Sequence, residues 1–249
     1  MLNIWLYSIL SVIVVSLVSL IGALTLYFRE EKLKKILIFF VSFSAGALLG
    51  GAFLHLLPEV IESGGYSLKV SASLLAGFFI FFVLEKYIHW RHCHEPTSNS
   101  HPHHLGTMNL VGDGLHNFLD GLIIAASYIT SPALGLAATL AIIFHEIPQE
   151  IADFGVLLHA GYTKKKAVFY NLLSAAVALI GVVIGLVLGG RIAGFNLFIL
   201  PIAAAGFIYI AAADLMPELH KETKMAKSLW QLVTFVIGVA LMHLLTFLE

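Results

Sequence analysis

Long apolar segments separated by short polar ones dominate the pattern of this chain. A helix needs about 20 mostly apolar residues to cross the hydrocarbon core of a bilayer. Eight segments reach that length, at roughly 4–28, 35–58, 66–88, 105–129, 133–159, 166–189, 195–219 and 229–248. Short connections join them, apart from a polar stretch at about 89–104. The pattern predicts an all-α integral membrane protein with eight transmembrane helices, forming a single domain over residues 1–249.

The composition supports the same class. Of the 249 residues, 59% are hydrophobic and 12% are charged, whereas soluble domains have about 45–50% and 25%. The net charge of −1 leaves no basic patch for a nucleic acid, and a lone cysteine, Cys93, excludes a disulfide within the chain. The first apolar segment follows no basic region and precedes no small-residue cleavage site, so we expect it to be retained as a span.

The basic residues predict the orientation. If the N-terminus lies outside, only Lys69 and Arg191 of the 14 lysines and arginines face outward. The other 12 fall in inward loops: Arg29, Lys32, Lys34, Lys35, Lys86, Arg91, Lys164, Lys165, Lys166, Lys221, Lys224 and Lys227. Basic residues near span ends favour the cytoplasmic side. We therefore expect both termini to be extracellular or periplasmic, with the 89–104 loop in the cytoplasm.

Glycines in two segments have the spacing that lets helices pack closely. Gly46 and Gly50 lie four residues apart in the second segment, and Gly181, Gly185 and Gly189 continue that spacing in the sixth. Small residues at this interval bring backbones together in lipid. Glycine is also common in membrane helices, so chance accounts for the spacing equally well.

Ionisable residues occupy the fourth segment where the bilayer centre should be. Each such group costs at least about 2.5–3.5 kcal/mol there, so function or pairing must support it. His116 and Asp120 lie one helical turn apart on one face, with Asn117 about 100° around the helix. An imidazole and a carboxylate suit Zn²⁺, Fe²⁺ or Mn²⁺. Asp113 could line the same path nearer the inner end.

The fifth segment repeats this arrangement more densely. His145 and Gln149 lie one turn apart, Glu146 and Glu150 do the same, and Asp153 continues the first row. Pro148 has no amide hydrogen, so the carbonyl of Phe144 loses its helical donor and becomes a candidate cation ligand. The alternative is that these groups satisfy one another as polar contacts between helices. Seven of them on two neighbouring spans favour a metal site.

Three other clusters allow two interpretations each. His55 and Glu59 flank Pro58 at the outer end of the second segment, and Asp214, Glu218 and His220 surround Pro217 at the inner end of the seventh. These residues could guide metal in and out, or could be solvated interfacial groups. The loop could receive or sense metal, or be a solvated linker. Its candidate ligands are His89, His92, Cys93, His94, His101, His103 and His104.

The segments His116-Asn-Phe-Leu-Asp120-Gly and His145-Glu-Ile-Pro-Gln-Glu150 resemble the signatures of ZIP metal transporters. The resemblance covers essentially the whole chain. It implies uptake of a divalent metal toward the cytosol, a fold of inverted repeats, and helix bundles that move as an elevator. It also implies one metal held by His116, Asp120, His145 and Gln149. A second metal would be held by Asn117 and Glu146, with Glu150 and Asp153 lining or tuning the path.

Two departures from the family pattern affect the expected site. Gln149 stands where this branch has histidine, and a neutral amide is a poorer ligand, so we expect a weaker or altered first site. The sixth segment, around Ser174 to Ala178, has no counterpart of the glutamate that completes a second site in some members. A full two-metal centre is therefore not expected from the sequence.

The predicted function is secondary transport of zinc, with iron, manganese or cadmium as alternatives, since the ligand types accommodate all four. A membrane metal sensor is a second hypothesis. An intramembrane metalloprotease is a third, although its His-Glu-x-x-His pattern ends here at Gln149. No enzyme activity or resident cofactor is expected, and the metal is the substrate. The expected partners are lipid and a second copy of the chain in a homodimer. The expected location is a prokaryotic inner membrane.

Overall fold

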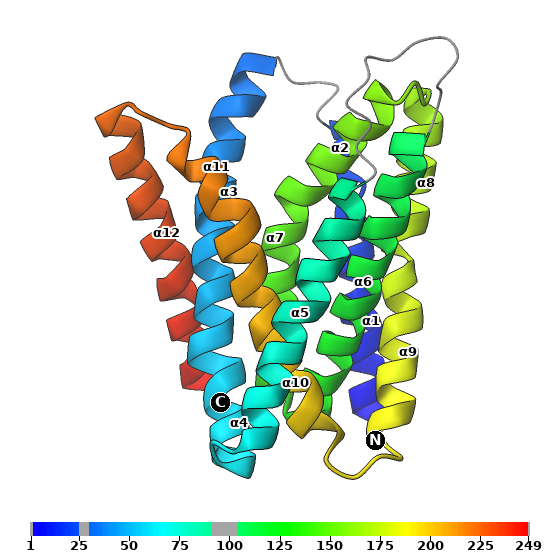
Figure 1. The fold of residues 1–249 in the computed structure, drawn as a ribbon, viewed down its shortest axis with the longest axis vertical. Helices are drawn as coiled ribbons and strands as arrows, with labels where there is room; N and C mark the ends of the chain where they lie inside the picture. The colour runs from blue at the N-terminus through cyan, green and yellow to red at the C-terminus, as the bar shows by residue number, and fades with distance from the viewer. Residues whose placement is uncertain (1, 25–29, 91–103, 249) are drawn as a thin grey trace.

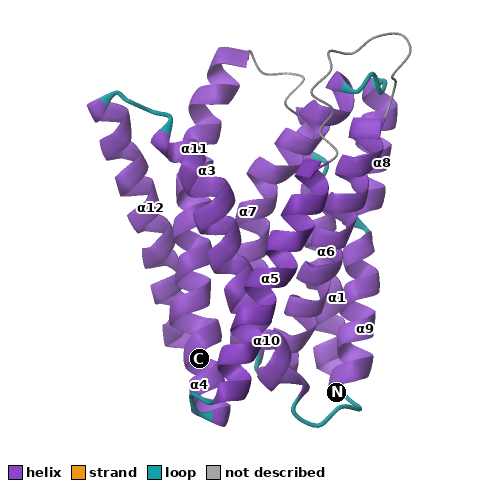
Figure 2. Ribbon diagram, viewed as in Figure 1, coloured by secondary structure: helices purple, strands orange, loops and turns teal. Residues whose placement is uncertain are grey.

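Helices make up every regular element in the part of the chain that the structure describes (Figure 2). The structure is a computed structural model, and it describes residues 2–24, 30–90 and 104–248. The first half forms α1 (Leu2–Val18), α2 (Ile21–Leu24), α3 (Glu30–Gly50), η2 (Gly51–Leu56), α4 (Leu57–Gly64), α5 (Leu68–Trp90), α6 (His104–Thr130) and α7 (Pro132–His159). The second half forms α8 (Lys164–Ala175), α9 (Val177–Gly189), α10 (Phe195–Tyr209), η3 (Ile210–Leu215), α11 (Met216–His220), α12 (Met225–Leu245) and η4 (Thr246–Leu248).

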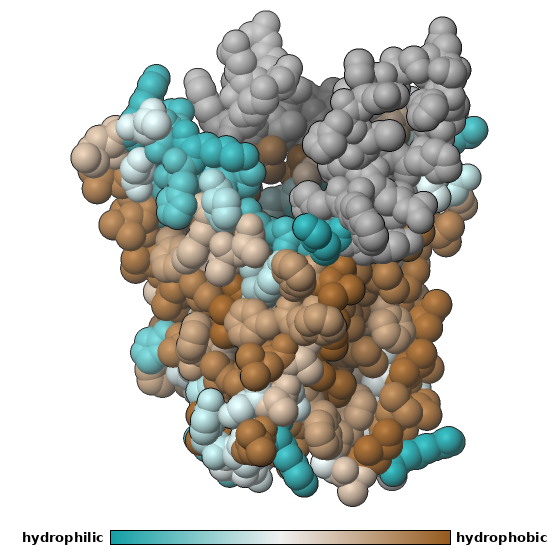
Figure 3. Space-filling model, viewed as in Figure 1, coloured by the Kyte–Doolittle hydropathy of each residue, from teal (hydrophilic) through white to brown (hydrophobic). Residues whose placement is uncertain are grey.

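The surface is that of a protein that crosses a membrane several times. Within the described residues, six helical stretches are long and apolar enough to span one, and α6 and α7 match them in length with 27 and 28 residues. Large apolar side chains such as Leu75, Phe79 and Trp230 are more than 60% exposed. A hydrophobic band crosses the visible face, with hydrophilic residues gathered toward its two ends (Figure 3). Apolar surface on this scale requires lipid around it.

The helices pack as two bundles that lie side by side (Figure 1). We call α1, α2, α6, α7, α8 and α9 the polar bundle, because it contains the buried ionisable residues of α6 and α7. The flanking bundle contains α3, η2, α4, α5, α10, η3, α11 and α12. The main contacts between the bundles join α3 to α7 and α10 to α6. The helix that carries half of the polar residues, α7, therefore lies against the flanking bundle.

Each bundle contains one very close helix crossing built on glycine. In the polar bundle, a Cβ added to Gly121 would meet the carbonyl of Ala178, and one added to Gly181 would meet the carbonyl of Phe118. In the flanking bundle, Gly46 and Gly238 approach the backbone of α12 and α3 in the same way. Of the two interpretations of the glycine spacing, the structure supports close helix packing at Gly46 and Gly181.

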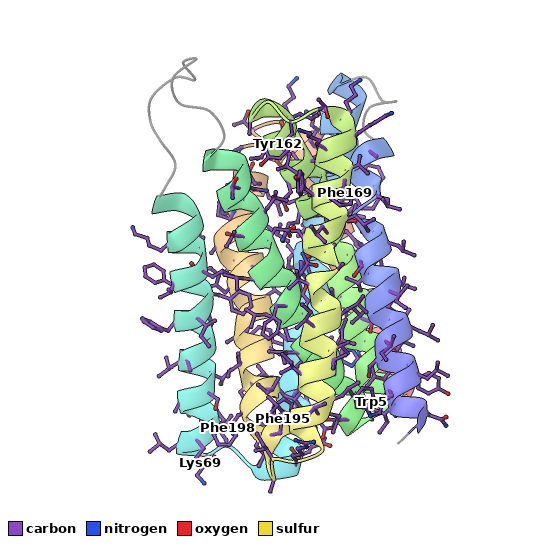
Figure 4. The ribbon with its side chains drawn as sticks, turned by 90° about the vertical axis from the view of Figure 1, so that its right-hand side faces the viewer. Trp5, Lys69, Tyr162, Phe169, Phe195 and Phe198 are labelled. Carbon is purple, nitrogen blue, oxygen red and sulfur yellow. The ribbon has the colours of Figure 1, made fainter. Side chains whose placement is uncertain are left out.

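One local motif occurs twice and in opposite directions. The π-helical segments η2 and η3 are six residues long, and each ends two residues before a proline, Pro58 or Pro217. η2 leads toward the lower end of the molecule as drawn in Figure 1, whereas η3 leads toward the upper end. The start of α1 and the end of α12 both lie at the lower end. Lys69 lies there too, and the lysines that begin α8 lie at the upper end (Figures 1 and 4).

Candidate metal centre

Four side chains from α6 and α7 converge where the polar bundle meets Phe81 of α5 and Phe207 of α10 in the flanking bundle. The spacing of His116 and Asp120 stacks them one turn apart on α6, and α7 brings His145 and Glu146 against them. All four residues are buried, with 6% exposure at most. Each offers one ligand atom, and the four atoms lie within 4.8 Å of one another.

The spacing of these atoms suits a tetrahedral metal. His116 Nε2 lies 3.1 Å from His145 Nε2, 3.3 Å from Glu146 Oε1 and 3.7 Å from Asp120 Oδ2. His145 Nε2 lies 3.4 Å from Asp120 Oδ2 and 3.3 Å from Glu146 Oε1. Zn²⁺ with bonds of about 2.0–2.2 Å separates tetrahedral ligands by about 3.3–3.6 Å. These five separations, from 3.1 to 3.7 Å, are thus close to those of a zinc ligand set.

The histidine of α7 is held in an orientation that presents a ligand lone pair. His145 Nδ1 lies 3.1 Å from the carbonyl oxygen of Ala141. Because a carbonyl only accepts, the ring proton belongs on Nδ1, and the neutral ring turns the Nε2 lone pair toward the other three ligands. No lysine or arginine is among the buried residues of the described chain. A cation is therefore the natural counterpart of the buried carboxylates.

A second group of carboxylates lies beside the first and shares Glu146 with it. Asp113, Glu146 and Glu150 each place one oxygen within 4.8 Å of the other two. Neighbouring donors stabilise two of these carboxylates. Asp113 accepts from the Asn117 amide at 2.8 Å and from the Ser174 hydroxyl. Glu150 accepts from the Asn171 amide. This second group has oxygen ligands only.

The structure also places the other residues of the predicted site. Gln149, implied as a ligand of the first metal, lines the cavity together with His116 and His145, and its role as a ligand stays a prediction. Glu146, implied as a ligand of the second metal, lies in the group of four. The amide of Asn117 is turned to Asp113. Asp153 is partly buried and accepts a hydrogen bond of 2.9 Å from Asn109.

A cavity of about 430 Å³ leads from the two histidines toward the upper end of the molecule. Its wall includes His116 and His145 at the inner end, and Asn109, Asp153 and Glu85 farther along α6, α7 and α5. These last residues lie in the upper parts of their helices (Figure 1). The cavity therefore connects the four-ligand group to the upper parts of α5, α6 and α7.

Some residues of the weaker sequence clusters line this cavity, and others lie elsewhere. Asp113 and Asp214 line the cavity. His55 is buried, and its Nε2 lies 2.7 Å from the carbonyl oxygen of Met242 in α12. Glu59 lies in α4, and the exposed residues Glu218 and His220 lie in α11, where Glu218 pairs with Lys221 at 2.5 Å.

Most of the histidine-rich loop lies outside the residues that the structure describes. His92, Cys93, His94, His101 and His103 lie outside the described residues, as do the side chains of His89 and His104. Their predicted role as metal ligands stays a prediction.

The expectation of an open carbonyl at Phe144 is wrong. Ser44 of α3 donates its hydroxyl to that oxygen at 2.5 Å. Pro148 does withhold the helical donor, as predicted, and α7 continues through it. A side chain of the neighbouring bundle supplies the missing donor.

Several polar residues around the site were missed in the sequence. Asn171 and Ser174 of α8 and Asn109 of α6 donate to the carboxylates of α6 and α7. Tyr209 donates to Glu85 at the cavity wall. In the sequence, Asn109, Asn171 and Ser174 are marked only as small polar residues within apolar segments. This pattern predicts little, because the side chains of such residues often bond to their own helix.

Helical spans, lipid-facing apolar surface and a buried nitrogen and oxygen ligand set define a multi-pass membrane protein with a candidate metal site. The profile of the ZIP zinc transporter family matches residues 2–107 and 104–246. The chain belongs to the ZIP zinc transporter family.

Three relatives show the extent of the similarity. The zinc transporter ZIP13 homolog of Drosophila melanogaster is 28% identical, over 98% of this chain and 89% of its own. Zinc transporter zipt-7.1 of Caenorhabditis briggsae is 28% identical, over 100% of this chain and 80% of its own. Zinc transporter ZIP13 of Pongo abelii is 34% identical, over 82% of this chain and 65% of its own. These relatives are from animals.

Proposed function

We propose that this protein carries a divalent metal, with Zn²⁺ as the preferred substrate, across a membrane toward the cytosol. The metal binds at His116, Asp120, His145 and Glu146, between the fourth and fifth spans. The tetrahedral spacing of these four ligand atoms is the main support. Iron, manganese and cadmium remain alternative substrates, since the same ligand types accept them.

The proposed membrane topology has eight spans, with both termini outside. The pairing of η2 with η3 supports an inverted repeat. The upper end carries the three lysines that begin α8, whereas Lys69 lies at the lower end. Because basic residues favour the cytoplasmic side, this distribution supports a cytoplasmic upper end. Trp5 lies toward the lower end and Tyr162 toward the upper end (Figure 4), as expected for residues at two membrane interfaces. The cavity then opens to the cytosol.

The remaining parts of the proposal rest on sequence. The loop at about 89–104 receives metal on the cytoplasmic side. Glu150 and Asp153 line or tune the path. The protein forms a homodimer in a prokaryotic inner membrane, a location that the animal relatives do not support. A metal sensor with the same site would bind Zn²⁺ without net flux.

Uptake into proteoliposomes tests the function. Wild type should accumulate Zn²⁺, and the double variant His145→Ala, Glu146→Ala should fall to the background of empty liposomes. Zn²⁺ binding without uptake by wild type would favour the sensor. Equal uptake of Zn²⁺, Fe²⁺, Mn²⁺ and Cd²⁺ by wild type and variant would exclude transport through this site.

A further inference from the structure

Ser44 of the flanking bundle contacts Phe144, the residue directly before the proposed metal ligands of α7. It is fully buried in α3, and its hydroxyl donates to the carbonyl oxygen of Phe144 at 2.5 Å. That carbonyl would normally accept from the amide of residue 148, which is proline and has no N–H. A buried carbonyl without a donor is costly, so Ser44 takes over a necessary role.

The carbonyl held by Ser44 belongs to the peptide unit that leads into His145. Because a peptide unit is planar, fixing its oxygen also fixes the nitrogen of His145. The preceding residue, Phe43, packs its ring edge-on against the Phe144 ring, with centroids 4.6 Å apart. Two consecutive residues of α3 thus hold both the backbone and the side chain of Phe144, directly before the ligands His145 and Glu146.

We propose that Ser44 is a positioning residue for the metal site. Its hydroxyl replaces the donor that Pro148 withholds, and so holds His145 and Glu146 at tetrahedral spacing from His116 and Asp120. The proposal rests on the proposed function in taking those four residues as the metal ligands. Ser44 acts through the peptide unit between Phe144 and His145, whose oxygen it holds.

The proposal predicts a specific dependence on Pro148. With proline at that position, Ser44→Ala leaves the Phe144 carbonyl without its donor, and α7 must shift to find another. With Pro148→Ala, the new amide donates to Phe144 within the helix, so the hydroxyl of Ser44 becomes dispensable. The two substitutions should therefore be non-additive.

The test is a double-mutant cycle on purified full-length protein, read out as Zn²⁺ affinity by competition with a fluorescent chelator. Ser44→Ala should weaken Zn²⁺ binding about tenfold, the factor that corresponds to one partly lost buried hydrogen bond. In the Pro148→Ala background the same change should alter affinity less than twofold. Ser44→Thr, which keeps the hydroxyl, should restore affinity to within twofold of wild type.

Ser42→Ala is the matched control. Ser42 is fully buried in the same helix and donates to the carbonyl of Gln231 at the same 2.5 Å, but that acceptor lies in α12. Its loss should leave Zn²⁺ affinity unchanged. In proteoliposomes, Ser44→Ala should raise KM about tenfold without lowering the maximal rate, whereas a general packing defect would lower the rate.

The outcomes separate this inference from the proposed function. If wild type binds Zn²⁺ but does not transport it, the proposed transport function is wrong, and the double-mutant cycle on Zn²⁺ affinity still tests the role of Ser44. If wild type transports and Ser44→Ala binds Zn²⁺ like wild type, or weakens binding equally in both backgrounds, the inference is overturned. Should Pro148→Ala misfold, equal effects of Ser44→Ala, Ser44→Thr and Ser42→Ala would overturn it as well. Failure of wild type to bind Zn²⁺ would overturn both.

Discussion

The polar bundle and the flanking bundle are packed in the same way but contain different chemistry. Each has a glycine crossing in which one backbone touches another, at Gly121 and Gly181 in the first and at Gly46 and Gly238 in the second. The polar bundle buries four carboxylates and two histidines in α6 and α7. The buried polar residues of the flanking bundle are His55, Gln231 and serines such as Ser42, Ser44 and Ser73.

The histidines of the two bundles show what this difference means. His145 and His55 are at most 2% exposed, and each has a ring nitrogen next to a backbone carbonyl. The second nitrogen of His145 faces Asp120 and Glu146, whereas His55 is turned to α12, away from the cavity. A buried histidine therefore becomes a candidate ligand only where a neighbouring helix adds further ligand atoms.

The largest expected effect comes from replacing each of these histidines. His145→Ala removes one of four ligands and should weaken Zn²⁺ binding by about 100-fold or more, since even indirect partners of metal ligands are worth about 10- to 100-fold. His55→Ala should lower the free energy of unfolding by about 1–3 kcal/mol and leave Zn²⁺ affinity of the folded protein unchanged. Chelator competition and thermal unfolding of purified protein measure both. Equal loss of Zn²⁺ binding in the two variants would refute the contrast between the bundles.

An intermediate effect is expected at the glycine crossings. Gly181→Ala and Gly46→Ala each add a Cβ against a backbone carbonyl, of Phe118 and Phe235 respectively. Each should lower stability by about 1–3 kcal/mol through overpacking. Gly181→Ala should also weaken Zn²⁺ binding, because it displaces the helix that carries His116, whereas Gly46→Ala should not. Wild-type melting temperatures for both variants would show that the crossings are looser than described.

The smallest effect is expected at the upper end, where α12 begins. Lys227 hydrogen-bonds to Glu222 at 2.6 Å and lowers the pKa of that carboxyl below its ordinary value. A lowered pKa stabilises the fold above the ordinary pKa and ceases to do so as the pH falls through the lowered value. Because the Lys227 side chain is 43% exposed and its attraction to Glu222 is screened by water, Lys227→Ala should leave Zn²⁺ binding unchanged and remove only a slight acid dependence of the melting temperature. A large loss of binding would link this surface to the metal site.

Local spacing made part of the site predictable. The four-residue interval between His116 and Asp120 places them on one helix face whatever surrounds the helix, and they do converge with His145. The place of Glu146 beside these three residues was different, because it depends on how α7 is rotated against α6. The donors from α8 were missed for the same reason, since Asn171 and Ser174 acquire their role only beside Glu150 and Asp113.

The sequence by itself determined the helical membrane class, the two helices that carry the candidate ligands and the helical donor that Pro148 withholds from Phe144. These properties follow from composition, from the 3.6-residue helical period and from the missing amide of proline, all of which act within one segment. Only the tertiary structure decided that Glu146 completes the group of four, that His55 is turned to α12, and that Ser44 bonds to Phe144. Each of these depends on the rotation and height of one helix against another, which packing across the whole bundle determines.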